Sequence, residues 1–258
     1  MVTIDTALRK CTKAAALPLG LGVRRRPADA IVLLYHKVGT GDREIDVPKE
    51  AFENQLDYLS DRGRAATLDD CLAHGGVTVT IDDGFRDFCE NVVPLAKDRK
   101  VPVLLYLATG YVSSNGNGGS HALTWADLRD AISTGLVEVG AHTHSHANLA
   151  NATEAEADGE MRRCKEMIED KLGVECRHFS YPWSLASPAA ERVARRLFAT
   201  AALPWQTNRR RSIDPHRVGR TPVLKSDGAL FFRAKVAGML DGEAFVYRAL
   251  RRGPWRTS

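Results

Sequence analysis

VTVTIDDG, at residues 77–84, is the stretch of this sequence that decides the fold. Five β-branched residues in succession favour a strand, and two adjacent carboxylates followed by a glycine mark its end. Several other segments are also β-rich and apolar, and four are nearly continuous hydrophobic runs, which is typical of strands buried on both faces. We expect seven strands, over residues 30–35, 77–82, 101–108, 136–141, 177–181, 198–203 and 217–223.

Amphipathic segments fill the gaps between these strands. Phe52, Leu56 and Leu59 recur at helical spacing, and Thr124 followed by Asp127 is typical of a capped helix start. The alternation of strands with helices predicts a parallel α/β architecture, either a barrel or an open doubly wound sheet. The strand count and chain length favour the barrel, and no nucleotide-binding glycine motif follows the first strand. Further helices are expected over residues 90–100, 153–172, 187–197 and 227–240.

The composition is that of a globular protein. The chain has 258 residues, with 36 Lys and Arg against 32 Asp and Glu, and 44% of it is hydrophobic. These values exclude a disordered or fibrous chain, and the length suits an α/β barrel that folds as one domain. Although the net charge is +4, aromatic residues are not interleaved with basic ones. We therefore expect no nucleic-acid partner.

The ends of the chain differ from its middle. We expect an N-terminal extension at residues 1–28, the barrel at 29–225, and a C-terminal helix with a basic tail at 226–258. The early apolar run is too short to span a bilayer and lacks a signal-peptidase site, and five cysteines without a CxxC pair favour a reducing compartment. The expected location is therefore cytoplasmic, and the basic clusters suggest peripheral contact with a membrane or a lipid-linked substrate. The sequence does not indicate an oligomeric state.

Carboxylates and imidazoles follow three of the expected strands. His36 follows the first, Asp82 and Asp83 end the second, and HTHSH, from His142 to His146, follows the fourth. Because the carboxyl ends of parallel strands meet at one rim of a barrel, these side chains are expected to lie together. Two adjacent carboxylates repel each other, and a cation relieves that cost. Two histidines and one aspartate would form a ligand set with an open coordination position, as in catalytic sites.

These motifs resemble those of the NodB-type polysaccharide deacetylases, carbohydrate esterase family 4. TIDDG at residues 80–84 is similar to the family's TFDDG motif, and HTHSH at 142–146 fits its H-[ST]-x-x-H motif. FSYPW at 179–183 resembles the third motif, usually RxPY, and LYHKV at 34–38 is similar to the exopolysaccharide-associated branch. The resemblance covers residues 30–224 and implies a distorted (β/α)7 TIM-like barrel, the NodB homology domain.

The resemblance also implies roles for single residues. Asp83, His142 and His146 are expected to bind a divalent metal, with zinc first and cobalt or nickel as alternatives, and Asp82 is expected to be the general base. The backbone N–H of Trp183 would help to hold the oxyanion that forms when water attacks an N-acetyl carbonyl. The implied activity is removal of N-acetyl groups from a sugar in a polysaccharide, a lipid-linked glycan or a precursor.

Two parts of the family pattern are not matched. Ser180 stands where the third motif has an arginine that orients the base, and Arg220, on the last expected strand, is the candidate replacement. The family's late histidine, which acts as general acid, has no clear match. His36 and His216 are the candidates for that role. His144 is expected to point away from the metal.

Other functions stay open at this point. The same metal centre could cleave another non-peptide C–N bond, such as that of a cyclic amide or a formamide, because the third-motif arginine is missing. A glycan-binding barrel without turnover is a non-enzymatic alternative, although a binding module has no need of a general base. A structural protein with fortuitous His and Asp clusters would bind no stoichiometric metal.

Overall fold

Seven parallel strands close into a barrel in the computed structural model, which describes residues 29–112, 122–204 and 213–239. β1 pairs with β4 on one side and with β9 on the other, and this second pairing closes the barrel. The (β/α)7 barrel expected from the sequence is therefore confirmed. Its strands are β1 (Ala30–Tyr35), β4 (Gly76–Asp83), β5 (Val103–Leu107), β6 (Val137–Ala141), β7 (His178–Ser180), β8 (Thr200–Pro204) and β9 (Val218–Pro222).

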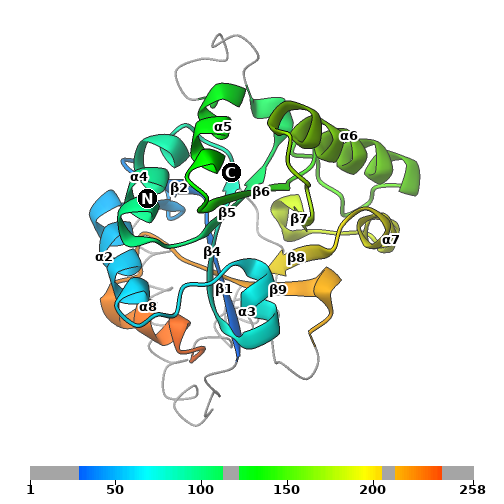
Figure 1. Cartoon of the computed structure of the whole chain (residues 1–258). Helices are drawn as coiled ribbons and strands as arrows, with labels where there is room; N and C mark the ends of the chain where they lie inside the picture. The colour runs from blue at the N-terminus through cyan, green and yellow to red at the C-terminus, as the bar shows by residue number, and fades with distance from the viewer. Residues whose placement is uncertain (1–28, 113–121, 205–212, 240–258) are drawn as a thin grey trace.

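Helices surround the barrel (Figure 1). The expected spacing is present in α2 (Lys49–Ser60), where Phe52, Leu56 and Leu59 are fully buried, and Thr124 and Asp127 form a capping box at the start of α5 (Trp125–Ser133). The helices are α2 (Lys49–Ser60), α3 (Leu68–His74), α4 (Val93–Arg99), α5 (Trp125–Ser133), α6 (Glu154–Leu172), α7 (Pro188–Leu197) and α8 (Ala229–Val236).

Two small features were not expected. α3 buries only Leu68 and Cys71, which are too few apolar positions to produce a helical period in the sequence. The strands β2 (Lys37–Val38) and β3 (Asp46–Val47) form a two-residue parallel pair outside the barrel. Both features lie in connections that the sequence pattern leaves without a signal.

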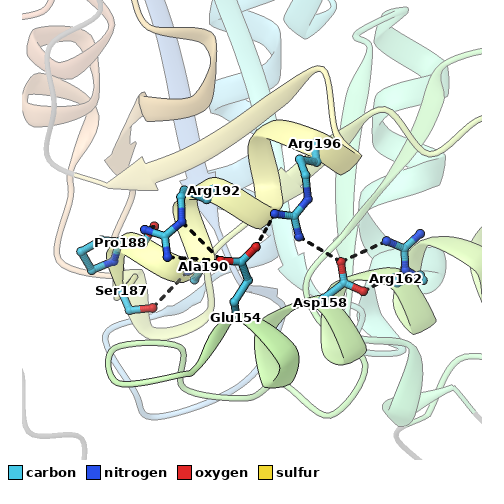
Figure 2. Close-up of polar contacts among 8 residues, drawn as sticks. All are labelled: Glu154, Asp158, Arg162, Ser187, Pro188, Ala190, Arg192 and Arg196. Atoms are coloured by element: carbon cyan, nitrogen blue, oxygen red, sulfur yellow. Dashed lines mark hydrogen bonds and ion pairs between the residues drawn. The ribbon is translucent and has the colours of Figure 1, made fainter.

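α6 and α7 are joined by a network of ion pairs on the outside of the barrel. Glu154, in the first turn of α6, pairs with Arg192 and Arg196 of α7 (Figure 2). One turn further along α6, Asp158 pairs with Arg162 and also with Arg196. A single exposed pair contributes little, but shared partners form a network. The network therefore holds together two helices that begin just after the loops that follow β6 and β7.

The predicted N-terminal extension lies outside the described residues, as do residues 240–258 of the predicted tail. In the part of the chain that the structure describes, no helix is both long and apolar enough to cross a membrane. The four described cysteines are free thiols: Cys71, Cys89, Cys164 and Cys176. The cytoplasmic location and the membrane contact stay predictions.

The barrel interior is tightly filled around Tyr106 of β5, which is completely buried. On the neighbouring strand, a Cβ added to Gly140 would lie 2.9 Å from Cδ1 of the Tyr106 ring and 2.7 Å from the backbone oxygen of His178. Both contacts are shorter than packed atoms tolerate, and the second is with backbone that cannot rotate away. Any larger residue at position 140 would clash with these atoms, so only glycine fits there.

We expect Gly140→Ala to destabilise the protein by about 1–3 kcal/mol, because the added methyl group overpacks the barrel interior. Gly159→Ala is the matched control, since Gly159 lies within α6 with no atom within 4 Å of an added Cβ. That change should stabilise the protein by about 0.5–1 kcal/mol through helix propensity. Urea unfolding of both variants measures the two free energies, and equal signs would contradict the packing argument.

Candidate active site

The polar side chains at the strand ends gather at the carboxyl-terminal rim of the barrel. Asp82 and Asp83 are the last residues of β4, and His142 comes directly after β6. His146 follows in the loop between β6 and α6. Asp83 has a φ of 77° and His146 a φ of 58°, which are rare values for residues other than glycine. Such backbone strain tends to gather at functional sites.

Asp83, His142 and His146 bring three ligand atoms to one point. Asp83 Oδ1 lies 3.1 Å from His146 Nε2 and 3.5 Å from His142 Nε2. These three residues, called the triad below, are the one group in the described part of the chain with the geometry to hold a metal ion. Asp83 Oδ1 is buried but accepts no well-formed hydrogen bond. An oxygen in this position fits a cation between it and the two imidazoles.

The tautomer of His142 supports the same conclusion. Its Nδ1 lies 2.8 Å from the backbone oxygen of Ser180, and because a carbonyl only accepts, Nδ1 must carry the proton. Burial lowers the pKa of His142, which opposes the charged form, although Asp82 and Asp83 act against this shift. A neutral His142 directs the lone pair of Nε2 towards the carboxylate of Asp83. Two lone pairs facing each other are repulsive unless a cation lies between them.

Asp83 is ionised over almost the whole pH range. Burial raises its pKa, but the imidazoles of His146, His36 and His142 outweigh burial and lower the pKa to about 2. The triad therefore offers one anionic oxygen and two nitrogen atoms. This donor set suits zinc and similar divalent ions.

The loop that carries His146 is fixed by Glu160 of α6. The carboxylate of Glu160 accepts hydrogen bonds from the backbone N–H of Ser145 at 2.8 Å and from its hydroxyl at 2.9 Å. The backbone oxygen of Glu160 accepts a further bond from the N–H of His144 at 3.2 Å. Thr143 and His146 on either side of this pair both have positive φ, at 61° and 58°. Glu160 thus holds a strained loop in the conformation that presents His146 to the triad.

His144 is not part of the triad. Its Nδ1 lies 2.9 Å from the hydroxyl of Thr109, and its backbone oxygen accepts a hydrogen bond from Gly110. Both partners belong to the short helix η2 (Thr109–Tyr111), which follows β5. His144 therefore joins the loop after β6 to the segment after β5.

Asp82 is held by Arg220 of β9, and both residues are only 2% exposed. Arg220 Nη1 donates to Asp82 Oδ1 at 2.6 Å and Nη2 donates to Oδ2 at 2.7 Å. Ser180 accepts a third bond, from Nη2 to its hydroxyl, at 2.6 Å. The small side chain at position 180 thus leaves room for a guanidinium that comes from another strand. Burial raises the pKa of Asp82, but Arg220 and His142 outweigh it, so that the pKa lies below its ordinary value.

The two candidate acids lie at opposite ends of the barrel. His36 is half-buried directly after β1, close enough to lower the pKa of both Asp82 and Asp83. His216 lies in η4 (Pro215–Arg217), before the amino end of β9, where its Nε2 is 2.9 Å from the backbone oxygen of Phe198. The structure thus places His36 at the same rim of the barrel as the triad, and His216 at the opposite end.

Aromatic side chains border the triad. Trp183, in η3 (Pro182–Ser184), is 47% exposed, and its ring centroid is 5.0 Å from that of His146. Tyr181 is buried and packs edge-on against Phe179 instead. Tyr111, which the sequence pattern did not indicate, is 43% exposed, and its ring centroid is 5.8 Å from that of His146. Its position just beyond a strand end was the available signal. Glu160 was also missed, because no short-range pattern connects it to the loop.

A family model described as polysaccharide deacetylase matches residues 70–202, which is just over half of the chain. The matched range contains the triad and Asp82, whereas His36 and Arg220 lie outside it. Among curated proteins, the chain is similar to a poly-beta-1,6-N-acetyl-D-glucosamine N-deacetylase of Staphylococcus aureus (strain MRSA252), with 23% identity over 188 residues. The alignment covers 60% of this chain, and the chain spans 65% of that protein's length.

Solved structures show the same barrel. IcaB from Ammonifex degensii superimposes with a TM-score of 0.69 at 25% identity, over 83% of this chain and 97% of that one. A polysaccharide deacetylase from Bacillus cereus gives a TM-score of 0.72 at 20% identity, over 81% of this chain and 69% of that one. The second likeness bears on the fold alone.

We expect Arg220→Met to destabilise the metal-free protein by about 3–5 kcal/mol at pH 7, because it leaves the Asp82 carboxylate buried without its partner. In the native protein, the pKa of Asp82 is lower than in the unfolded chain, and this difference stabilises the fold at any pH above the unfolded pKa. The stabilisation is lost as the pH falls through the pKa of the folded state. In the variant both contributions of Arg220 are gone, and burial, the largest single influence, raises the pKa of Asp82 against the weaker opposing effects of His142 and His36. The stability deficit should therefore shrink as the pH is lowered from 7 to 5.

Urea unfolding of both proteins at the two pH values tests this expectation. Arg217→Met is the control, because Arg217 is exposed and pairs with Glu191 outside the barrel. The control should change stability by less than about 0.5 kcal/mol at either pH. A deficit that stays constant between pH 7 and 5 would mean that Arg220 does not set the ionisation of Asp82.

We expect Glu160→Ala to weaken binding of Zn²⁺ or Co²⁺ about 10- to 100-fold, because the His146 loop loses its support while all three triad residues remain. Competition with a chromogenic chelator measures the affinity directly. Glu166→Ala is the matched control, since Glu166 is an exposed glutamate of the same helix. Equal metal affinity in the two variants would show that Glu160 has no part in positioning His146.

Proposed function

Because this chain belongs to the polysaccharide deacetylase family, we propose that it is a metal-dependent hydrolase that removes acetyl groups from an N-acetylated glycan. The observation that carries the proposal is the pair of adjacent carboxylates in different settings. Asp83 faces two imidazole nitrogens, whereas Asp82 is held by Arg220. One carboxylate is thus arranged as a ligand and the other as a base. The family and its named relative support the exopolysaccharide-associated branch predicted from the sequence.

The residues divide the reaction among them. When bound at the triad, a divalent ion would supply Lewis-acid activation of water and of the acetamide carbonyl. Asp82 accepts the proton of the attacking water, and Arg220 keeps this carboxylate ionised and oriented. The backbone N–H of Trp183 donates to the oxygen on which negative charge develops. His36 donates a proton to the departing amine, so that acetate and a free amino sugar are the products.

The substrate class follows from the named relative. That protein's name gives poly-beta-1,6-N-acetyl-D-glucosamine as its substrate, and we propose an N-acetylhexosamine in a glycan for this chain. Zinc is the proposed ion, with cobalt or nickel as substitutes. The donor set of one carboxylate and two neutral imidazoles suits all three ions.

The contact between Arg220 and Asp82 weakens the case for the alternative functions. Cleavage of a cyclic amide or a formamide depends on the lack of a third-motif arginine at position 180, but Arg220 provides a guanidinium at Asp82. A glycan-binding barrel without turnover has no use for a buried, ionised carboxylate beside a ligand set. Keeping two charges inside the barrel carries a desolvation cost that binding alone does not require.

We expect Asp82→Asn to retain its metal and to release acetate at least about 100-fold more slowly than wild type, because an amide cannot accept the proton of water. His142→Ala should lose the metal and the activity together. Elemental analysis and acetate release from β-linked N-acetylglucosamine oligomers measure the two properties. Asp130→Asn, at an exposed position on α5, is the matched control and should resemble wild type.

Two results would overturn the proposal. Full activity in Asp82→Asn would remove the assigned base. If zinc- or cobalt-loaded wild-type protein released no acetate from any N-acetylhexosamine substrate, the deacetylase function itself would fall.

A further inference from the structure

Two polar side chains from the connection after β4 fix the backbone next to His36. Asp87 is buried, and its Oδ2 accepts a hydrogen bond from the N–H of Val38 at 2.5 Å. Asn91 is half-buried, and its Nδ2 donates to the backbone oxygen of Val38 at 2.7 Å. Val38 lies in β2, two residues after His36. Both backbone groups of Val38 are therefore bound by side chains that come from another part of the chain.

These two side chains take the place of a neighbouring strand. β2 pairs with β3 along one edge, where the N–H of Gly39 donates to the backbone oxygen of Val47 at 2.8 Å. Because the backbone groups of successive residues in a parallel strand face opposite edges, those of Val38 face away from β3. Asp87 and Asn91 occupy that second edge. A strand of only two residues is thus held from both sides.

The connection that carries Asp87 and Asn91 has an unusual backbone. It contains a π-helix, η1 (Phe88–Val92), which begins directly after Asp87 and includes Asn91. Helices of this type are rare and are frequently found at functional sites. On the opposite segment, Gly39 has a φ of 152°, and an added Cβ would lie 3.1 Å from Asn91 Nδ2. Glycine thus allows the two segments to approach each other closely.

The hydrogen bond to Asp87 is kept at a cost to stability. Among the described residues, the buried Oδ1 of Asp87 has no hydrogen-bond partner. Burial raises the pKa of Asp87, and the N–H of Val38 opposes this rise. A neutral acceptor would avoid the desolvation cost of a carboxylate. A charged acceptor forms the shorter and stronger hydrogen bond, which favours a role in precise positioning over one in stability.

The position of His36 depends on these contacts. Within the described residues, the His36 ring has no hydrogen-bond partner, so its place is set by the backbone that carries it. Tyr35, just before it, is the last residue of β1 and is completely buried. Val38, two residues after it, is held by Asp87. Asp87 follows Asp83 by four residues, so the segment that carries a triad ligand also anchors the backbone of His36.

We propose that Asp87 and Asn91 are positioning residues that hold His36 in place as the proton donor to the departing amine. The inference rests on the proposed function, which assigns this proton transfer to His36. Both side chains act through the backbone of Val38. Without them, the imidazole would shift relative to the leaving nitrogen while the triad stays intact. A displacement of about 1 Å can lower a rate about 100-fold.

Two substrates test the proposal, because only one of their leaving groups needs a proton. The amine of an N-acetylglucosamine oligomer requires a proton donor, whereas the phenolate of 4-nitrophenyl acetate departs without one at neutral pH. In the zinc-loaded protein, we expect Asp87→Ala to lower kcat for acetate release from the oligomer about 10- to 100-fold, with little change in KM. Hydrolysis of the ester should stay within about twofold of wild type. Equal losses with both substrates would show a merely structural role and overturn the proposal.

Further variants separate positioning of His36 from general damage to the segment. Asp87→Asn keeps an acceptor for the N–H of Val38 and should retain most of the oligomer rate, whereas Asn91→Ala should lower it. In a His36→Ala background, Asp87→Ala should have no further effect, because both changes remove the same proton transfer. Asp98→Ala, at an exposed position on α4, is the matched control and should resemble wild type. Additive losses in the double variant would contradict the proposal.

A measurement without turnover separates this inference from the proposed activity. In proton–carbon NMR spectra, the Cε1–H signal of His36, assigned with His36→Ala, should shift or broaden in Asp87→Ala and stay unchanged in Asp87→Asn. If wild type releases no acetate but this pattern appears, the positioning of His36 by Asp87 stands and the deacetylase function falls. If acetate is released but Asp87→Ala matches wild type in this signal and in both rates, the function stands and the positioning role falls.

Discussion

The ion pair between Arg220 and Asp82 is the constraint on which the rest of the site depends. Both charges are buried inside the barrel, and each would carry a large desolvation cost without the other. Asp82 lies next to the end of β4 and Arg220 lies in β9, with β1 between these two strands. The pair therefore crosses the barrel interior, and it keeps Asp82 ionised beside Asp83. Arg220 balances the negative charge of Asp82, and Asp83 is left to face the two imidazoles.

Most of the barrel could be predicted from sequence because several strands are runs of β-rich, apolar residues that end in an abrupt change of chemistry. The run at 77–84 shows this most clearly, since its buried residues lead directly into two carboxylates. Short elements gave no such signal. α3 contributes two buried side chains, and β2 and β3 contain two residues each. Segments of that length are determined by the surrounding packing and not by a local pattern.

The candidate site divides in the same way. The positions of Asp82, Asp83, His142 and His146 at one rim could be predicted, because the carboxyl ends of parallel strands meet there. Arg220 could only be proposed as a replacement, since its contact with Asp82 joins residues 138 positions apart. The contacts of Glu160 and Tyr111 with the His146 loop could not be predicted, because they depend on how a helix and a neighbouring loop pack against the strand ends. The spacing of residues along the chain does not indicate such contacts.

Ser180 links the two halves of the centre through different atoms of one residue. Its backbone oxygen selects the tautomer of His142, and its hydroxyl accepts from the guanidinium that orients Asp82. The strand that carries it, β7, is only three residues long. A small shift of this strand would therefore disturb both the orientation of His142 and the contact of Arg220 that keeps Asp82 ionised. A redesign that places arginine at position 180 would therefore have to rebuild both contacts together.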